Sequence, residues 1–196
     1  MKVLWFANCP CGAEEKLGIR DFGGGWVKSL EDKLVENDEI ELTVCFYWNR
    51  PLLPFKYKRT YYYPIFRNTG NNKIIFHLKK YFPQINDKSE IPLLIQVTNS
   101  VKPDIIHIHG TEDNFGLIQK FTEIPCVISI QGLLSPYFVK YFEGIPKTIA
   151  NKYESFRTKL IFTPISITYN YLKKRSLREQ IILLKSKHII GRTNWD

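Results

Sequence analysis

The sequence has 196 residues, enough for one domain with its own core and too few for two domains of ordinary size. Hydrophobic residues make up 44% and charged residues 24%, and these proportions exclude a disordered chain, a collagen and a disulfide scaffold. The net charge of +9 is uneven: residues 42–86 hold 8 basic residues and no acidic one, and residues 140–196 hold 12 basic and 4 acidic ones. Such blocks indicate either a solvated surface or a surface for an anionic partner.

The cysteine content and the hydropathy restrict the class of protein further. Cys9, Cys11, Cys45 and Cys126 are too few in a chain of this length to indicate a disulfide framework. Cys9 and Cys11 have one residue between them, whereas zinc knuckles and thioredoxin-like sites have two. A membrane-spanning helix needs about 20 apolar residues, and no stretch of the sequence provides them. We therefore expect reduced thiols, no bound metal and a cytoplasmic location.

The first third of the chain predicts a β-α-β unit. Residues 2–7 form an apolar run that ends at a polar loop, as a buried parallel strand does. From Gly24 apolar residues recur at helical spacing until Asn37, which predicts a helix. Residues 40–48 are rich in β-branched and aromatic residues and predict the next strand. A right-handed crossover would make these two strands parallel.

The middle of the chain predicts two further strands and two helices. We expect a strand near residues 61–66 and a helix near residues 73–81, followed by a helix over residues 91–101. Residues 105–110 are apolar apart from two histidines, so this strand should be buried on both faces.

The last part of the chain is expected to be mostly helical. Thr111 is placed to cap a helix that carries Phe115 to Phe121. A strand over residues 126–130 follows, and a short strand over residues 188–191 comes near the end. The long helix between them has an apolar stripe made by Leu177, Ile181 and Leu184. Buried strands that alternate with helices predict an α/β fold, a Rossmann-like open parallel sheet with helices on both faces.

In such a sheet the ligand binds beyond the carboxyl ends of the strands, where the strand order reverses. The first candidates are Gly23, Gly24 and Gly25, which open the first helix. Their backbone N–H groups and the helix dipole could meet a diphosphate or a sugar. Their spacing matches neither the dinucleotide fingerprint nor a P-loop, and the alternative is a flexible entry to the helix.

Two other strand ends carry polar candidates. His107 and His109 share one face of their strand, and His109 with Gly110 lies nearest the carboxyl end. We expect His107 to be a core histidine, and His109 is either functional or a second core residue. Gln131 and Gly132 follow the next strand; the amide either hydrogen-bonds a hydroxyl-rich ligand or holds the neighbouring loop.

Several segments together resemble a known family. In chain order KVLWFAN, GGGW, KPDIIHIHG, VISIQG and KHIIGRTNWD are similar to segments in the amino-terminal half of a family-four glycosyltransferase with the GT-B fold. The resemblance covers the whole chain. It implies that residues 1–196 are the acceptor-side Rossmann-like domain, that a carboxy-terminal donor-binding domain is absent from this chain, and that this part alone is inactive.

The resemblance also implies an activity and roles for the candidates. The parent enzyme would be a hexosyltransferase that moves a sugar from a nucleotide-sugar to a glycan or lipid-linked acceptor, with retention and without a metal, in bacterial surface polysaccharide biosynthesis. Many members have a histidine where this sequence has Gln131, so His109 and Gln131 are the catalytic candidates. The glycine positions would approach the donor phosphates and the acceptor; these are Gly23, Gly24, Gly25, Gly110 and Gly132.

The basic blocks leave alternatives open. The resemblance suggests peripheral contact with the inner face of the membrane, through a patch of Lys173, Lys174, Arg175 and Arg178. A stand-alone sugar- or nucleotide-binding module would have the same fold. A basic nucleic-acid-binding domain is less favoured, because the sequence has no helix-turn-helix, zinc finger or RNP signature.

Overall fold

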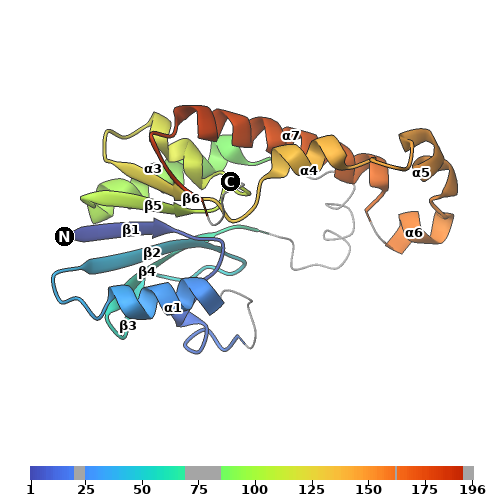
Figure 1. Ribbon diagram of the computed structural model, residues 1–196. Helices are drawn as coiled ribbons and strands as arrows, with labels where there is room; N and C mark the ends of the chain where they lie inside the picture. Colours follow the sequence, from blue (N-terminus) through green and yellow to red (C-terminus); the bar gives the residue numbers. More distant parts are fainter. Residues whose placement is uncertain (20–24, 69–84, 162, 192–196) are drawn as a thin grey trace.

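The computed structural model describes residues 1–19, 25–68, 85–161 and 163–191, and these residues form a sheet of seven strands with helices on both faces (Figure 1). The strand order is β3-β4-β2-β1-β5-β6-β7. The strands are β1 (Lys2–Phe6), β2 (Glu41–Trp48), β3 (Phe55–Tyr57), β4 (Thr60–Phe66), β5 (Ile105–His109), β6 (Cys126–Ser129) and β7 (His188–Ile190). All neighbours pair in parallel except β3 and β4. The prediction of a Rossmann-like α/β sheet is therefore confirmed.

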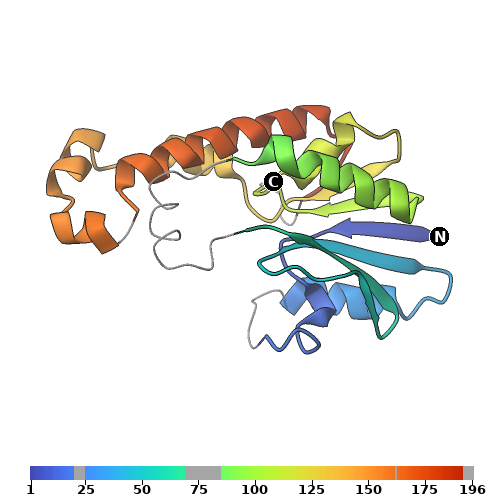
Figure 2. The ribbon, with the colours of Figure 1, turned by 180° about the vertical axis from the view of Figure 1, so that it is seen from behind.

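The helices cover the two faces unequally. One face carries η1 (Cys11–Ala13) and α1 (Gly25–Leu34), and the other carries α3 (Asp87–Val101), η2 (Phe115–Lys120) and α7 (Ile165–Lys185), as Figures 1 and 2 show. The connection from β6 to α7 holds α4 (Leu134–Lys140), α5 (Lys147–Tyr153) and α6 (Phe156–Ile161). In Figure 1, α5 and α6 extend away from the sheet beyond the start of α7. None of the helices in the described ranges is both long and apolar enough to cross a membrane.

The core has two halves, one on each face of the sheet, because side chains alternate along a strand. Leu4 and Phe6 of β1 belong to the half beneath α3, η2 and α7, whereas Trp5 and Ala7 belong to the half beneath α1. Gly116 permits close packing of η2 on α7, since a Cβ at this position would lie 2.3 Å from Cγ2 of Ile182. The central strands are thus buried on both faces, as their near-continuous apolar sequences predict.

Local expectations differ from the structure at two places, and a third lies outside the described residues. Residues 115–120 form a 3₁₀ helix with Asn114 at its N-cap, so the prediction of Thr111 as the cap was wrong. The Thr111 hydroxyl instead donates to Glu179. The edge strand β3 was not predicted, because three residues carry too short a pattern. The helix expected over residues 73–81 lies outside the described residues.

The expected apolar stripe on α7 is exposed to solvent. Leu177, Ile181 and Leu184 are 50%, 44% and 88% exposed. The buried face of α7 carries Glu179 and Ile182 instead, each with no exposed surface. Periodicity identified the helix correctly, whereas its buried face carries a polar residue, Glu179, that has tertiary partners.

Candidate functional site

The carboxyl ends of the parallel strands meet at one edge of the sheet, and the strand order from β4 to β7 is the order of dinucleotide-binding folds. The chain adds strands on one side of β1 and then on the other, so the order reverses between β1 and β5. A cavity of about 380 Å³ opens at this edge. It is lined by Asn8, Tyr47, Trp48, Asn49, Arg67, Glu112, Asp113 and Arg175. These residues come from the ends of β1, β2, β4 and β5 and from α7, which places the cavity where this fold binds ligands.

A network of charges fixes one wall of the cavity. The Arg67 guanidinium donates to Glu90 at 2.7 and 2.8 Å and to Asp113 at 2.8 and 3.0 Å. Its central carbon lies 3.3 Å from the centre of the Tyr47 ring. Although burial opposes the charged form, hydrogen bonds from Arg67 lower the pKa of Asp113. The Tyr47 hydroxyl donates to Asn114 Oδ1 at 2.6 Å, so the ends of β2 and β4 and the loop after β5 are held together.

Glu112 belongs to the loop that follows β5, and its side chain lies close to the loop that follows β6. A Cβ on Gly110 would lie 2.1 Å from Glu112 Oε2, and a Cβ on Gly132 would lie 3.7 Å from Glu112 Oε1. Oε2 is buried and has no hydrogen-bond partner among the residues that the structure describes. Burial raises the pKa of this carboxyl group. Glu112 thus lies in the cavity wall with one carboxyl oxygen buried against Gly110.

Of the two predicted glycines beside Glu112, only Gly110 is required by the backbone and by packing. Gly110 has a φ of +91°, a backbone conformation that only glycine adopts easily. Its N–H donates to the Ser129 carbonyl at 2.8 Å. The Gly132 carbonyl accepts from the Thr111 hydroxyl at 3.4 Å. Both glycines lie at the carboxyl edge, as predicted, but only Gly110 makes room for Glu112, since a Cβ at Gly132 would make an ordinary contact.

Glu179 of α7 supports the same loops from beneath. Its carboxylate has no exposed surface and accepts from the N–H groups of Leu134 and Ser135 at 2.7 and 2.8 Å. It also accepts from the Thr111 hydroxyl at 2.9 Å. The carboxylate thus satisfies two orphan N–H groups at the start of α4 and links the loops after β5 and β6.

His109 lies at the end of β5, where the strand order reverses, and is completely buried. The ring centres of Trp5, His107 and Trp26 lie 4.5, 4.0 and 5.7 Å from its own. Neither ring nitrogen has a hydrogen-bond partner within the described ranges. Burial, together with the charge of His107, lowers the pKa of His109 to about 3, so the ring is neutral at pH 7.

The two histidines of β5 differ in their hydrogen bonds. His107 forms a 2.6 Å hydrogen bond between its Nε2 and the Ser129 hydroxyl, which confirms it as a satisfied core histidine. A ligand cannot contact the His109 ring in this structure, because the ring has no exposed surface. The catalytic role of His109 thus remains a prediction, as does that of Gln131, which is half-buried beyond the end of β6.

The remaining glycine candidates are described only in part. Gly25 is the first residue of α1 and is exposed, and its carbonyl accepts from the Ser29 hydroxyl at 2.9 Å. A Cβ at Gly25 would have no heavy atom within 4 Å, so packing does not require glycine there. Gly23 and Gly24 lie outside the described residues.

The predicted basic patch divides into two pairs. Lys173 and Lys174 are exposed, whereas the arginines contact the loop after β5. Arg175 donates to the Glu112 carbonyl at 3.0 and 2.5 Å. Arg178 donates to the same carbonyl at 2.9 Å and to Asp87 at 2.8 Å. The two arginines fix α7 to the candidate site, so the four side chains do not form one outward-facing surface.

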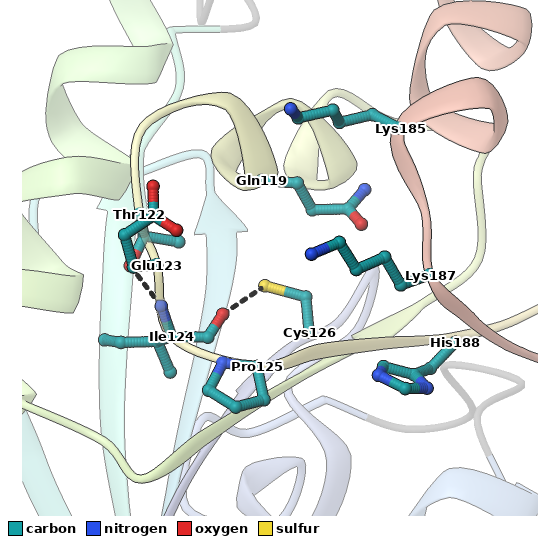
Figure 3. Close-up of a pocket in the computed structure, with 9 residues that line it drawn as sticks. All are labelled: Gln119, Thr122, Glu123, Ile124, Pro125, Cys126, Lys185, Lys187 and His188. Carbon is teal, nitrogen blue, oxygen red and sulfur yellow. Dashed lines mark hydrogen bonds between the residues drawn. The ribbon is translucent and has the colours of Figure 1, made fainter.

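A second cavity, of about 230 Å³, lies at the opposite edge of the sheet (Figure 3). Its wall includes Cys126 and His188, the first residues of β6 and β7. Figure 3 shows Lys185 and Lys187 on one side of it and Glu123 on the other. Because ligands of open α/β sheets bind at the carboxyl ends of the strands, we take the larger cavity at that edge as the candidate site.

The candidate site can bind polar groups through several kinds of contact. Asn8 and Asn49 offer amides, the half-buried Glu112 offers a carboxyl group, and Trp48 offers an aromatic surface. Among the described residues no three His, Cys, Asp or Glu side chains come together as metal ligands.

Most residues that line the larger cavity were not predicted from the sequence. The signal that could have found Glu112 and Asp113 is their place directly after His109-Gly110, at a strand end that had already been selected. Arg67 could have been suspected from its position after the strand near residues 61–66. Comparison with known proteins adds no assignment: no protein-family model matches the chain, and no curated protein matches its sequence.

Proposed function

We propose that this chain is the acceptor-binding part of a retaining glycosyltransferase, which uses a nucleotide-sugar to extend a glycan or a lipid-linked acceptor. The observation that carries the proposal is the cavity at the carboxyl edge, beside the reversal of strand order. Its wall combines aromatic rings with amide and charged groups, which suits a ligand with apolar ring faces and many hydroxyl groups. The resemblance of the sequence to the acceptor-side half of family-four enzymes supports the same function.

The residues of the cavity would have distinct tasks. Asn8 and Asn49 are exposed at the mouth and would hydrogen-bond acceptor hydroxyls. Trp48 would contact the apolar face of a sugar ring. Glu112, a half-buried residue of the cavity wall whose pKa is raised by burial, would exchange hydrogen bonds with a hydroxyl group. Donor binding belongs, by the resemblance, to a second domain, and this chain alone would then transfer no sugar.

Binding of immobilised glycans tests this assignment. We expect the chain to bind a subset of bacterial-type oligosaccharides, and Asn8→Ala and Asn49→Ala each to weaken binding about fivefold, since one net hydrogen bond contributes about 1 kcal/mol. Asn99→Ala is the matched control, because Asn99 is an exposed amide on α3 far from the cavity wall. Equal affinities for all three variants, or turnover of a nucleotide-sugar by this chain alone, would contradict the proposal.

A membrane-facing surface is favoured by a separate observation. The segment α4–α6 exposes large apolar side chains, with Tyr137 60%, Val139 76%, Tyr153 76% and Phe156 79% exposed, and α5 and α6 project from the body (Figure 1). Contiguous exposed apolar groups mark interaction surfaces. Lys147 and Lys152 of α5 are exposed beside them. We propose that this segment, rather than the patch on α7, contacts an anionic membrane surface.

Sedimentation with lipid vesicles tests the membrane contact. At low salt we expect the chain to sediment with anionic phosphatidylglycerol vesicles and much less with neutral phosphatidylcholine vesicles. Tyr153→Ser combined with Phe156→Ser should reduce sedimentation several-fold. Leu53→Ser is the control, because Leu53 is 82% exposed but precedes β3 at the other end of the sheet. Equal sedimentation with both kinds of vesicle would reject this contact.

A further inference from the structure

Two thiols approach each other in the loop that follows β1. Cys9 Sγ lies 3.9 Å from Cys11 Sγ, and the Cys11 thiol also lies 3.5 Å from the Cys9 carbonyl oxygen. Only Pro10 separates the two residues, and Cys11 has a φ of +51°, in the left-handed region. This backbone turn places both side chains together although the residues are near neighbours. A disulfide needs about 2.05 Å between its sulfurs, so the two sulfurs, 3.9 Å apart, would have to approach by about 1.9 Å to form the bond.

The two thiols differ in access and in acidity. Cys9 is half-buried, whereas Cys11 has no exposed surface. The hydrogen bond from Cys11 lowers the pKa of Cys9 despite partial burial. The same interaction, together with burial, raises the pKa of Cys11. Reactive cysteines combine thiolate character with partial exposure, and within this pair Cys9 has both properties.

We propose that Cys9 and Cys11 are a redox-active dithiol, which forms an intramolecular disulfide by exchange with a small-molecule disulfide such as oxidised glutathione. The Cys9 thiolate attacks one sulfur of the small disulfide, whose S–S bond breaks, and one small thiolate leaves. Cys11 then loses its proton and attacks the Cys9 sulfur; the Cys9–Cys11 bond forms and the second small thiolate leaves. The two protein thiols are oxidised, the small disulfide is reduced to two thiols, and these take up the two protons.

The other two cysteines lack this geometry. Cys45 has no exposed surface. Cys126 is half-buried, its thiol donates to the Ile124 carbonyl at 3.3 Å, and burial raises its pKa to about 11. Near pH 8 a larger fraction of Cys9 than of Cys126 is thiolate, because the pKa of Cys9 is the lower one. A more acidic thiol is a weaker nucleophile, which offsets part of this difference. We expect Cys9 to react about tenfold faster than Cys126.

Peptide mapping after oxidation tests the proposal. The folded chain is incubated with oxidised glutathione, quenched with acid, unfolded and alkylated with iodoacetamide. We expect the peptide with Cys9 and Cys11 to carry no alkyl group and to be two hydrogens lighter than its dithiol form, whereas Cys45 and Cys126 are alkylated. Dithiothreitol should restore two alkylation sites. A peptide that stays fully alkylated, or keeps a glutathione adduct on Cys9 without progress to the disulfide, would overturn the proposal.

Single variants assign the two steps. Cys11→Ser should stop the reaction at the Cys9–glutathione adduct, and Cys9→Ser should give no adduct at Cys11. Cys126→Ser is the control and should oxidise like the natural sequence. If Cys11→Ser does not fold, early acid quenching of the natural sequence replaces it. A transient glutathione adduct is then expected on Cys9, and an adduct first formed on Cys11 would contradict the assigned order.

Discussion

Replacement of Glu179 by alanine tests whether this buried carboxylate holds the loops of the candidate site. Glu179 is fully buried and accepts from the N–H groups of Leu134 and Ser135 and from the Thr111 hydroxyl. Thr111 keeps its 3.4 Å contact with the Gly132 carbonyl, so the main loss is two backbone donors without a partner. Each buried donor left without a partner costs about 1–3 kcal/mol.

We therefore expect Glu179→Ala to lower the free energy of unfolding by about 3 kcal/mol, since entry of water would satisfy part of the loss. For a domain of this size the corresponding fall in Tm is about 9 °C. Thr111→Val removes one hydrogen bond and should cost about 1 kcal/mol. Glu143→Ala is the control, because Glu143 forms an exposed ion pair with Lys140 and should cost less than about 0.5 kcal/mol.

Urea unfolding monitored by circular dichroism gives these free energies. Amide hydrogen exchange of Leu134 and Ser135 reports the local effect, and both amides should exchange faster in Glu179→Ala than in Glu143→Ala. A loss below about 1 kcal/mol in Glu179→Ala, with unchanged exchange at both amides, would refute the role assigned to this carboxylate.

Two further predictions concern Gly110 and the buried histidines. Gly110→Ala should lower stability by about 1–3 kcal/mol, because the residue has a positive φ and its Cβ would collide with Glu112; Gly144→Ala, with a positive φ but open space, should cost less in the same thermal unfolding assay. Burial lowers the pKa of His107 to about 4 and that of His109, with the charge of His107, to about 3, against about 6.5 in the unfolded chain. As the pH falls, the unfolded chain therefore binds protons before the folded chain does. The free energy of unfolding that comes from the two neutral histidines is complete above pH 6.5. It is lost as the pH falls toward 4 and then 3, by up to about 1.4 kcal/mol per pH unit for each histidine. His109→Phe should flatten the dependence of urea midpoints on pH between 6.5 and 4, and an unchanged slope would contradict the argument.

The sheet could be predicted from the sequence because its strands are short apolar runs that are buried on both faces. Residues 2–7 and 105–110 were expected as strands, and β1 and β5 occupy nearly those positions. The position of each strand end then placed the predicted residues at the carboxyl edge, where the larger of the two cavities lies. The rule for open α/β sheets is the reason this edge is the candidate site, and ligand binding there stays a prediction.

The composition of the site could not be predicted, since it depends on contacts between distant segments. Glu90 and Asp113 meet Arg67 across 23 and 46 residues. Arg178 was assigned to a surface patch on the basis of the family resemblance, yet it is only 8% exposed and contacts Asp87. Sequence periodicity contains no information about such partners, so the buried face of α7, which carries Glu179, was not predicted.

The most direct test of the central claim maps where a sugar binds to the folded chain. Amide chemical shifts are recorded by NMR during titration with short neutral oligosaccharides, chosen from those that the immobilised glycans identify. We expect shifts at Asn8, Trp48, Asn49 and Glu112, around the cavity at the carboxyl edge. Shifts confined to Gln119, Lys187 and His188, which line the opposite cavity, would contradict it.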